Sequence, residues 1–165
     1  MAERAGVSVG SLYQYFPNKD ALIAALHARH VERMMIVIER ALANAMHGSL
    51  AQALSELIEG AVEAHRVETG LHQVLELQLA GLDLVSARDS FDTVLRERVV
   101  AVLERHRDEL SVPDLKLAAF MLMHSAHALI HAVVLQRPKG VSLPAATREI
   151  VRMVHSYLTG APAPA

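Results

Sequence analysis

The chain has 165 residues, 52% of them hydrophobic, and a formal net charge of −2, which fits a soluble protein with a sizeable core and excludes one that is basic throughout, such as a histone-like protein. It contains no cysteine, so disulfides, thiol chemistry and thiolate metal sites are excluded. The opening residues Met1-Ala-Glu-Arg lack the apolar run of a signal peptide, and we expect a cytoplasmic location.

The first elements of the chain have the form of a helix-turn-helix. Gly6 can adopt the left-handed backbone that ends a first short helix. Ser8 can cap a second helix of about two turns from Val9 to Phe16, and Pro17 ends it because the residue before a proline is disfavoured in the α region. A glycine-containing turn followed by a short helix with exposed aromatic and hydroxyl side chains is typical of a DNA-reading element.

The remaining chain is predicted to be helical throughout, so we expect an all-α fold. Apolar residues recur at helical spacing, and no run of alternating β-branched residues indicates a strand. We expect Asn18, Ser49 and Ser142 to cap helices, and Pro113 to occupy the first turn of another. The expected helices cover residues 18–48, 49–70, 71–81, 86–110, 113–136 and 142–160, followed by a disordered tail over residues 161–165.

One predicted helix is apolar on nearly all sides. From Leu117 to Leu135 it contains no Asp, Glu, Lys or Arg, so it must be covered on several sides. Its length meets the minimum for a membrane span, but its three histidines, its serine and its amphipathic neighbours argue against that alternative, and we expect no membrane contact. We expect one side of this helix to pack in its own domain and the other to pack against a second subunit.

Histidines are unusually frequent, with 10 in the chain. His124, His127 and His131 fall within about 60° of one another around a helix. Imidazoles so arranged can coordinate zinc or nickel, but no Asp, Glu or Cys accompanies them and they span nearly two turns. We therefore expect them to lie at a dimer interface or in a ligand cavity, with a metal site as the alternative, and we expect no cofactor.

The residues from Ala2 to Leu22 read AERAGVSVGSLYQYFPNKDAL and closely resemble the DNA-binding signature of the tetracycline-repressor (TetR) family of bacterial transcription regulators. The signature is specific because Leu-Tyr-x-Tyr-Phe-x-Asn-Lys places several dissimilar residue types at fixed spacing. The match extends roughly from Ala2 to Leu26, and the rest of the chain resembles the family only as a pattern of helices.

The resemblance implies which residues contact double-stranded DNA. In that family the residues matching Tyr13 and Lys19 hold the phosphate backbone, and those matching Ala5, Leu12 and Phe16 pack internally. The residues that approach base edges or nearby phosphates match Val9, Gly10, Ser11, Gln14 and Tyr15.

The family also places another helix, usually preceded by a basic arm, before the residue that matches Met1. The resemblance therefore implies a partial helix-turn-helix domain over residues 1–25 and a ligand-binding and dimerisation domain over residues 26–160. Either the first helix is encoded upstream of Met1 or DNA binding is weakened, and these two alternatives stay open.

The resemblance implies a ligand-responsive repressor that binds a palindromic operator as a homodimer and is released by an unknown small-molecule effector. An apolar or aromatic effector is expected from the candidate pocket residues Leu75, Leu79, Phe91, Leu95, Phe120, Met121, Met123 and His124. The last two long helices would pair with those of a twin, through the candidate interface residues Ala128, His131, Val134, Leu135, Ile150, Val154 and Tyr157. The alternative is a dimeric ligand-binding or interaction module without DNA binding. The sequence contains no phosphate loop, nucleophile elbow or His-Glu-x-x-His arrangement, so we expect no enzymatic activity.

Overall fold

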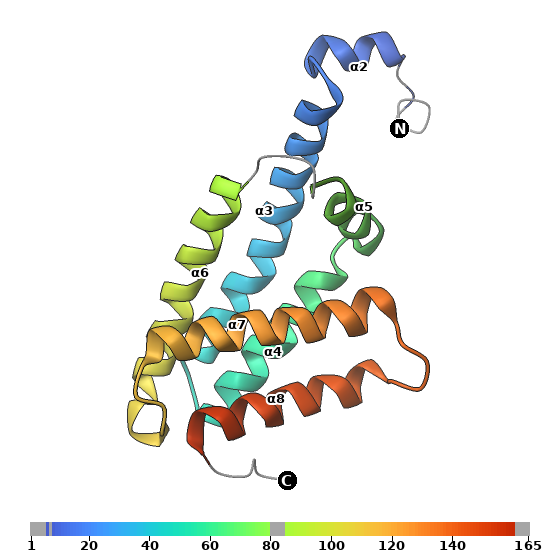
Figure 1. Cartoon of the computed structure of the whole chain (residues 1–165). Helices are drawn as coiled ribbons and strands as arrows, with labels where there is room; N and C mark the ends of the chain where they lie inside the picture. The colour runs from blue at the N-terminus through green and yellow to red at the C-terminus, as the bar shows by residue number, and fades with distance from the viewer. Residues whose placement is uncertain (1–5, 7, 80–84, 161–165) are drawn as a thin grey trace.

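The computed structural model of the protein describes residues 6, 8–79 and 85–160, and Figure 1 shows its course. None of these described residues forms a strand, which confirms the predicted all-α fold. The helices are α2 (Val9–Tyr15), α3 (Lys19–Ala45), α4 (Leu50–Arg66), α5 (Thr69–Leu79), α6 (Val85–Arg105), the short 3-10 helix η1 (Arg107–Glu109), α7 (Leu115–His131), the π-helical turn η2 (Ala132–Gln136) and α8 (Leu143–Thr159).

The three predicted helix caps are confirmed. The side chain of Asn18 accepts a hydrogen bond from the backbone N–H of Ala21 at 2.8 Å, which begins α3. Ser49 and Gln52 exchange side-chain and backbone hydrogen bonds in a capping box at the start of α4. The hydroxyl of Ser142 accepts one hydrogen bond, from the backbone N–H of Ala145 at 3.3 Å, and begins α8. These three helices thus begin where a short polar side chain satisfies an exposed backbone N–H group.

The break predicted at Gly70, between the expected helices over residues 49–70 and 71–81, lies earlier in the chain. α4 ends at Arg66 and α5 begins at Thr69, after a turn in which Glu68 has φ 51°. Gly70 was expected to end the helix, yet it lies in the first turn of α5. The carboxylate of Glu68 accepts a hydrogen bond from Arg33 of α3 at 2.8 Å, so the turn is held by a tertiary contact that the local sequence does not reveal.

Two other helix boundaries differ from the prediction. α6 ends at Arg105, and η1 fills most of the segment that was expected to extend the helix to Leu110. Pro113 precedes α7 instead of occupying its first turn, because Asp114 caps the helix by accepting two backbone N–H groups at 2.9 and 3.1 Å. The other end of this helix reaches Gln136 as predicted, although its last turn is π-helical.

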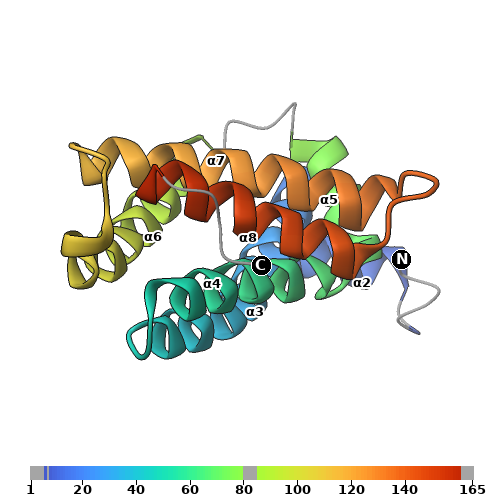
Figure 2. The same ribbon diagram turned by 90° about the horizontal axis from the view of Figure 1, so that it is seen from below.

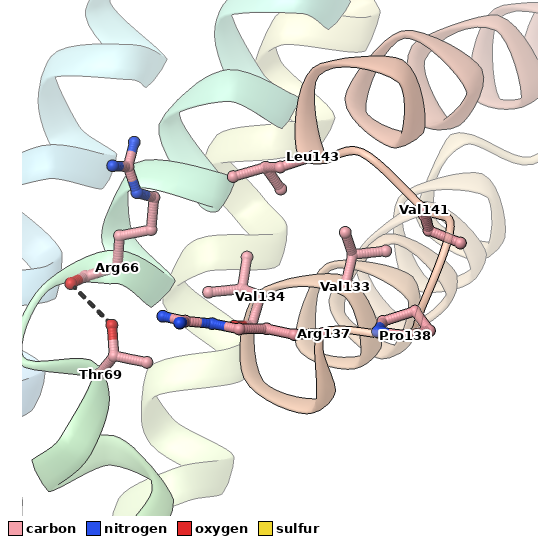
Figure 3. A pocket seen from close by; sticks show the side chains of 8 residues that line it. All are labelled: Arg66, Thr69, Val133, Val134, Arg137, Pro138, Val141 and Leu143. Atoms are coloured by element: carbon pink, nitrogen blue, oxygen red, sulfur yellow. Dashed lines mark hydrogen bonds between the residues drawn. The ribbon is translucent and has the colours of Figure 1, made fainter.

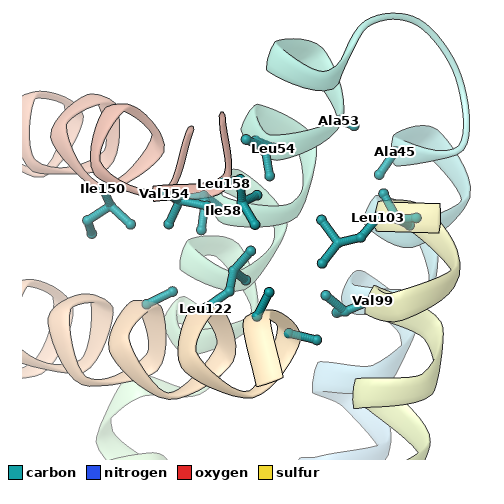
Figure 4. Packing of buried hydrophobic residues seen from close by; sticks show 14 of the residues in the cluster. Ala45, Ala53, Leu54, Ile58, Val99, Leu103, Leu122, Ile150, Val154 and Leu158 are labelled. Carbon is teal, nitrogen blue, oxygen red and sulfur yellow. The ribbon is translucent and has the colours of Figure 1, made fainter. Parts of the chain in front are cut away.

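α3 and α4 pack side by side, and α7 crosses the body of the protein next to α8 (Figures 1 and 2). The close approach of α3 and α4 requires glycine at position 60, because a Cβ atom there would collide with the Cβ of Ala41. The core lies among α4, α6, α7 and α8, as Figure 4 shows. Its most buried large side chains are Leu50, Leu54, Ile58, Val102, Leu103, Ile130 and Leu158.

The segment Leu115–Gln136 is long and apolar enough to cross a membrane by length and composition. In the fold, however, α7 packs against α4, α6 and α8, as the core helix of a globular domain does. The predicted tail over residues 161–165 lies outside the described residues.

Candidate functional site

The short helix α2 stands at the N-terminal end of α3, at the opposite end of the protein from α7 and α8 (Figure 1). Gly6, which precedes it, has φ +68° as predicted for the turn. Tyr13 and Tyr15 are 54% and 82% exposed, and Gln14 between them is also exposed. Large aromatic side chains this exposed carry surface that a partner molecule can cover.

The residues around this helix can contact a nucleic acid. A phenol or a lysine ammonium donates to phosphate oxygens, and an exposed Gln amide can pair bidentately with adenine. Lys19 is exposed in the first turn of α3, where the helix dipole also favours an anion. Gly10 is exposed as expected, while the side chains predicted to reach DNA from Val9 and Ser11 lie outside the described part.

A second exposed surface lies on the outer faces of α7 and α8. Six apolar side chains there are between 40% and 55% exposed: Leu117, Phe120, Met121, Leu129, Met153 and Tyr157. Ala128 and His124 are also exposed on α7. The predicted interface residues Ala128 and Tyr157 therefore lie where a second copy can reach them.

The structure corrects the other part of the predicted interface. Four of the predicted residues are 3–8% exposed in the single chain, so they pack in its own core and cannot contact a twin: Val134, Leu135, Ile150 and Val154. The sequence from α7 into η2 is apolar on nearly all sides, so periodicity does not distinguish the inner face from the outer face at Val134 and Leu135. Ile150 and Val154 lie on the buried face of α8, which packs against α4 of the same chain.

The predicted effector pocket is also corrected. Phe120, Met121 and His124 are exposed on the outer face of α7, so they do not line an interior cavity. Leu75 is buried, Leu95 and Met123 pack half-buried against the core, and the side chains of Leu79 and Phe91 lie outside the described part.

The three histidines predicted to act together are divided. His124 Nδ1 contacts the carbonyl oxygen of Phe120 at 2.9 Å, and its ring lies 4.1 Å from that of Phe120. His127 and His131 instead join a group of rings that includes three buried histidines from other helices: His30, His65 and His72. Sequence reasoning missed these three because they come from α3, α4 and α5 and form no local pattern.

An open cleft of about 490 Å³ lies between the α4–α5 turn and the loop that joins η2 to α8 (Figure 3). Two arginines face it from opposite walls among apolar side chains. Arg66 pairs with Glu63 at 3.5 Å, and Arg137 Nε donates to the carbonyl of Val134 at 3.4 Å. Both guanidinium groups are thus engaged within the chain, and we assign no ligand to this cleft.

Two family profiles match the chain. Residues 1–26 match the profile described as "Bacterial regulatory proteins, tetR family", and residues 49–158 match "Tetracyclin repressor-like, C-terminal domain". No curated protein matches the chain. The second profile alone covers more than half of the sequence, and the chain therefore belongs to the tetR family of DNA-binding transcription regulators.

Proposed function

We propose that the protein is a cytoplasmic, homodimeric repressor that binds a palindromic operator through α2 and releases it when an effector binds among the helices that follow α3. The observation that carries this proposal is the presence of two exposed surfaces at opposite ends of the folded molecule. α2 presents Tyr13, Gln14 and Tyr15 to solvent, and α7 and α8 present an apolar face.

The apolar face supports the homodimer. An exposed patch built from several large apolar side chains on adjacent helices is rare on a monomer and common at subunit interfaces. Two copies related by a two-fold axis would bury the same α7 and α8 residues from each subunit. The two α2 helices would then project from the same dimer, as a two-fold symmetric operator requires.

Recognition of the base sequence and contact with the phosphate backbone are assigned to different residues of α2 and of the first turn of α3. Gln14 would pair with a base edge, whereas Tyr13 and Lys19 would hold phosphates and fix the position of the helix. Gly10 allows close approach of the backbone to DNA because it has no side chain, and Val9, Ser11 and Tyr15 would contact neighbouring bases or phosphates.

The test uses operator sequences selected by the natural full-length protein from random double-stranded DNA. We expect Lys19→Ala to weaken binding to all sequences alike and to reduce the slope of log affinity against log salt by roughly one. Gln14→Ala should relax sequence preference at one position, by about 1–3 kcal/mol. Matched controls are Lys139→Ala and Gln136→Ala, both exposed residues near the α7–α8 loop.

The controls should leave affinity, salt slope and sequence preference unchanged. If Lys19→Ala behaves like Lys139→Ala, the phosphate assignment is wrong. If no sequence is enriched by the natural protein, the alternative of a dimeric ligand-binding or interaction module replaces the repressor.

A further inference from the structure

Five histidine rings from four helices form one contiguous group that reaches from the interior to the surface of the protein. His30 of α3, His65 of α4 and His72 of α5 are 2%, 5% and 8% exposed. His127 and His131 of α7 complete the group. Burying polar imidazoles has a free-energy cost unless their nitrogens find partners, so such a group needs an explanation beyond packing.

Four of these rings, which we call the histidine ring set, form a closed circuit: His65, His72, His131 and His127. Their successive centroids are 5.4, 6.1, 6.0 and 5.0 Å apart. Two imidazoles that ligate one zinc ion, each with a Zn–N bond of about 2.0–2.1 Å, place their centroids roughly 5 Å apart. Two sides of the circuit already have nearly this length, and the two that meet at His131 are about 1 Å longer.

The nitrogen atoms of one pair have the spacing of zinc ligands. His65 Nε2 lies 3.3 Å from His127 Nδ1, and two nitrogens on one tetrahedral zinc ion are separated by about 3.3 Å. The other nitrogen of His65, Nδ1, contacts the carbonyl oxygen of Ala61 at 2.8 Å. That contact selects the tautomer that donates from Nδ1 and leaves a lone pair on Nε2, as in metal-ligating histidines.

His72 is held by an equivalent outer contact. Its Nδ1 lies 2.8 Å from His30 Nε2, so a metal ion bound to Nε2 of His72 would leave that contact intact. His30 Nδ1 in turn lies 3.6 Å from Glu68 Oε2, and the Glu68 carboxylate is paired with Arg33. At this distance the carboxylate acts on His30 through its charge and not through a hydrogen bond.

We propose that the histidine ring set binds one divalent transition-metal ion through imidazole nitrogens, with zinc the best match. Four neutral nitrogen donors suit zinc and its neighbours in the first transition row better than calcium or magnesium, which prefer oxygen. His30 and Glu68 act as positioning residues and do not contact the ion. His127 is exposed in the single chain, so an ion can reach the set.

The site closes on binding. No group of three His, Cys, Asp or Glu side chains in the described part of the chain is already placed to hold a metal ion. The ion must draw the four rings together, including the opposite pairs His65–His131 and His72–His127, to reach the ring spacing of bound zinc. A ligand that moves helices in this way favours one of two conformations, which is what an effector requires. This regulatory consequence rests on the proposed function, whereas the metal site itself does not.

The decisive experiment is calorimetric titration of the chelator-treated protein with Zn²⁺, without DNA. We expect one ion per chain. His127→Ala and His72→Ala should each weaken binding by more than the roughly 10–100-fold loss that removal of an outer partner causes, and His30→Gln should fall within that range. The matched control is His124→Ala, on the same helix but outside the set, which should bind like the unmodified chain.

A second readout separates ligation from a structural effect. Co²⁺ in a tetrahedral nitrogen site absorbs strongly in the visible, and this absorption should appear in the unmodified chain and His124→Ala and be lost in His127→Ala. Because the His127 side chain is exposed, its removal should leave the circular dichroism spectrum unchanged. The proposal is overturned if the unmodified chain shows no saturable Zn²⁺ binding, or if His127→Ala and His72→Ala bind with unchanged affinity. Zn²⁺ binding that leaves operator affinity unaltered would keep the site and reject its role as the effector site.

Discussion

Replacement of Ala128 by glutamate tests the proposed dimer most directly. Ala128 lies on the outer face of α7, between the exposed Met121 and the half-buried His131, and is itself exposed in the single chain. A glutamate there would touch no core residue of its own subunit, so the free energy of unfolding of the monomer should change by less than about 0.5 kcal/mol. In a two-fold interface the same carboxylate appears twice and faces apolar side chains.

The expected change in the dimer Kd follows from the free-energy cost of desolvating the two introduced charges. One buried charge without a partner costs about 3–5 kcal/mol, and two-fold symmetry doubles the effect. A loss of about 6 kcal/mol or more corresponds to a dimer Kd raised more than about ten-thousand-fold. We therefore expect sedimentation at micromolar concentration to give 18.0 kDa for the variant and twice that mass for the unmodified chain.

Ala101→Glu is the matched control, because Ala101 is an exposed alanine in α6. This variant should sediment as a dimer, and both variants should give the helical circular dichroism spectrum of the unmodified chain. An unmodified chain that sediments as a single species of 18.0 kDa would refute the dimer. A dimer that survives Ala128→Glu would show that the outer face of α7 is not the interface.

Two further substitutions test the fold. Gly60→Ala should lower the free energy of unfolding by about 1–2 kcal/mol, because overpacking against Ala41 outweighs the gain in helix propensity. The control Gly70→Ala, where nothing lies within 4 Å, should instead raise the free energy of unfolding by up to about 1 kcal/mol. Equal effects of the two substitutions in urea titrations would contradict the close contact between α3 and α4. Val134→Glu places a charge at a site only 5% exposed and should abolish the helical circular dichroism signal; a folded variant that merely dissociates would return Val134 to the subunit interface.

The parts of the fold predicted correctly are those that local chemistry determines. Asn18, Ser49 and Ser142 cap helices because each needs only its own side chain and the next three backbone N–H groups. The turn at Glu68 was missed because an ion pair with Arg33, 35 residues away, holds it. Judged by backbone preference alone, Gly70 was the better candidate for the residue that ends the helix.

The faces of α7 could not be predicted, for a related reason. A hydrophobic stripe identifies the buried side of a helix only when the opposite side is polar. α7 is apolar on both sides, so Met121 and Val134 look equivalent in the sequence although one is 47% exposed and the other 5%. Packing against α6 and α8 decides between the faces, and that packing is a property of the whole chain.

The domain boundary expected between residues 25 and 26 falls inside α3, which runs without a break from Lys19 to Ala45. α3 therefore connects the turn that follows α2 to the histidine group, to which it contributes His30. His30 lies 11 residues beyond Lys19 along this helix, which corresponds to about 16 Å. In the proposed function, a shift of α3 near His30 would tilt this helix as a body and displace its N-terminal end, next to α2. Such control requires two slightly different ways in which α4, α5 and α7 pack against α3. The effector must bind one of these two conformations more tightly than the other.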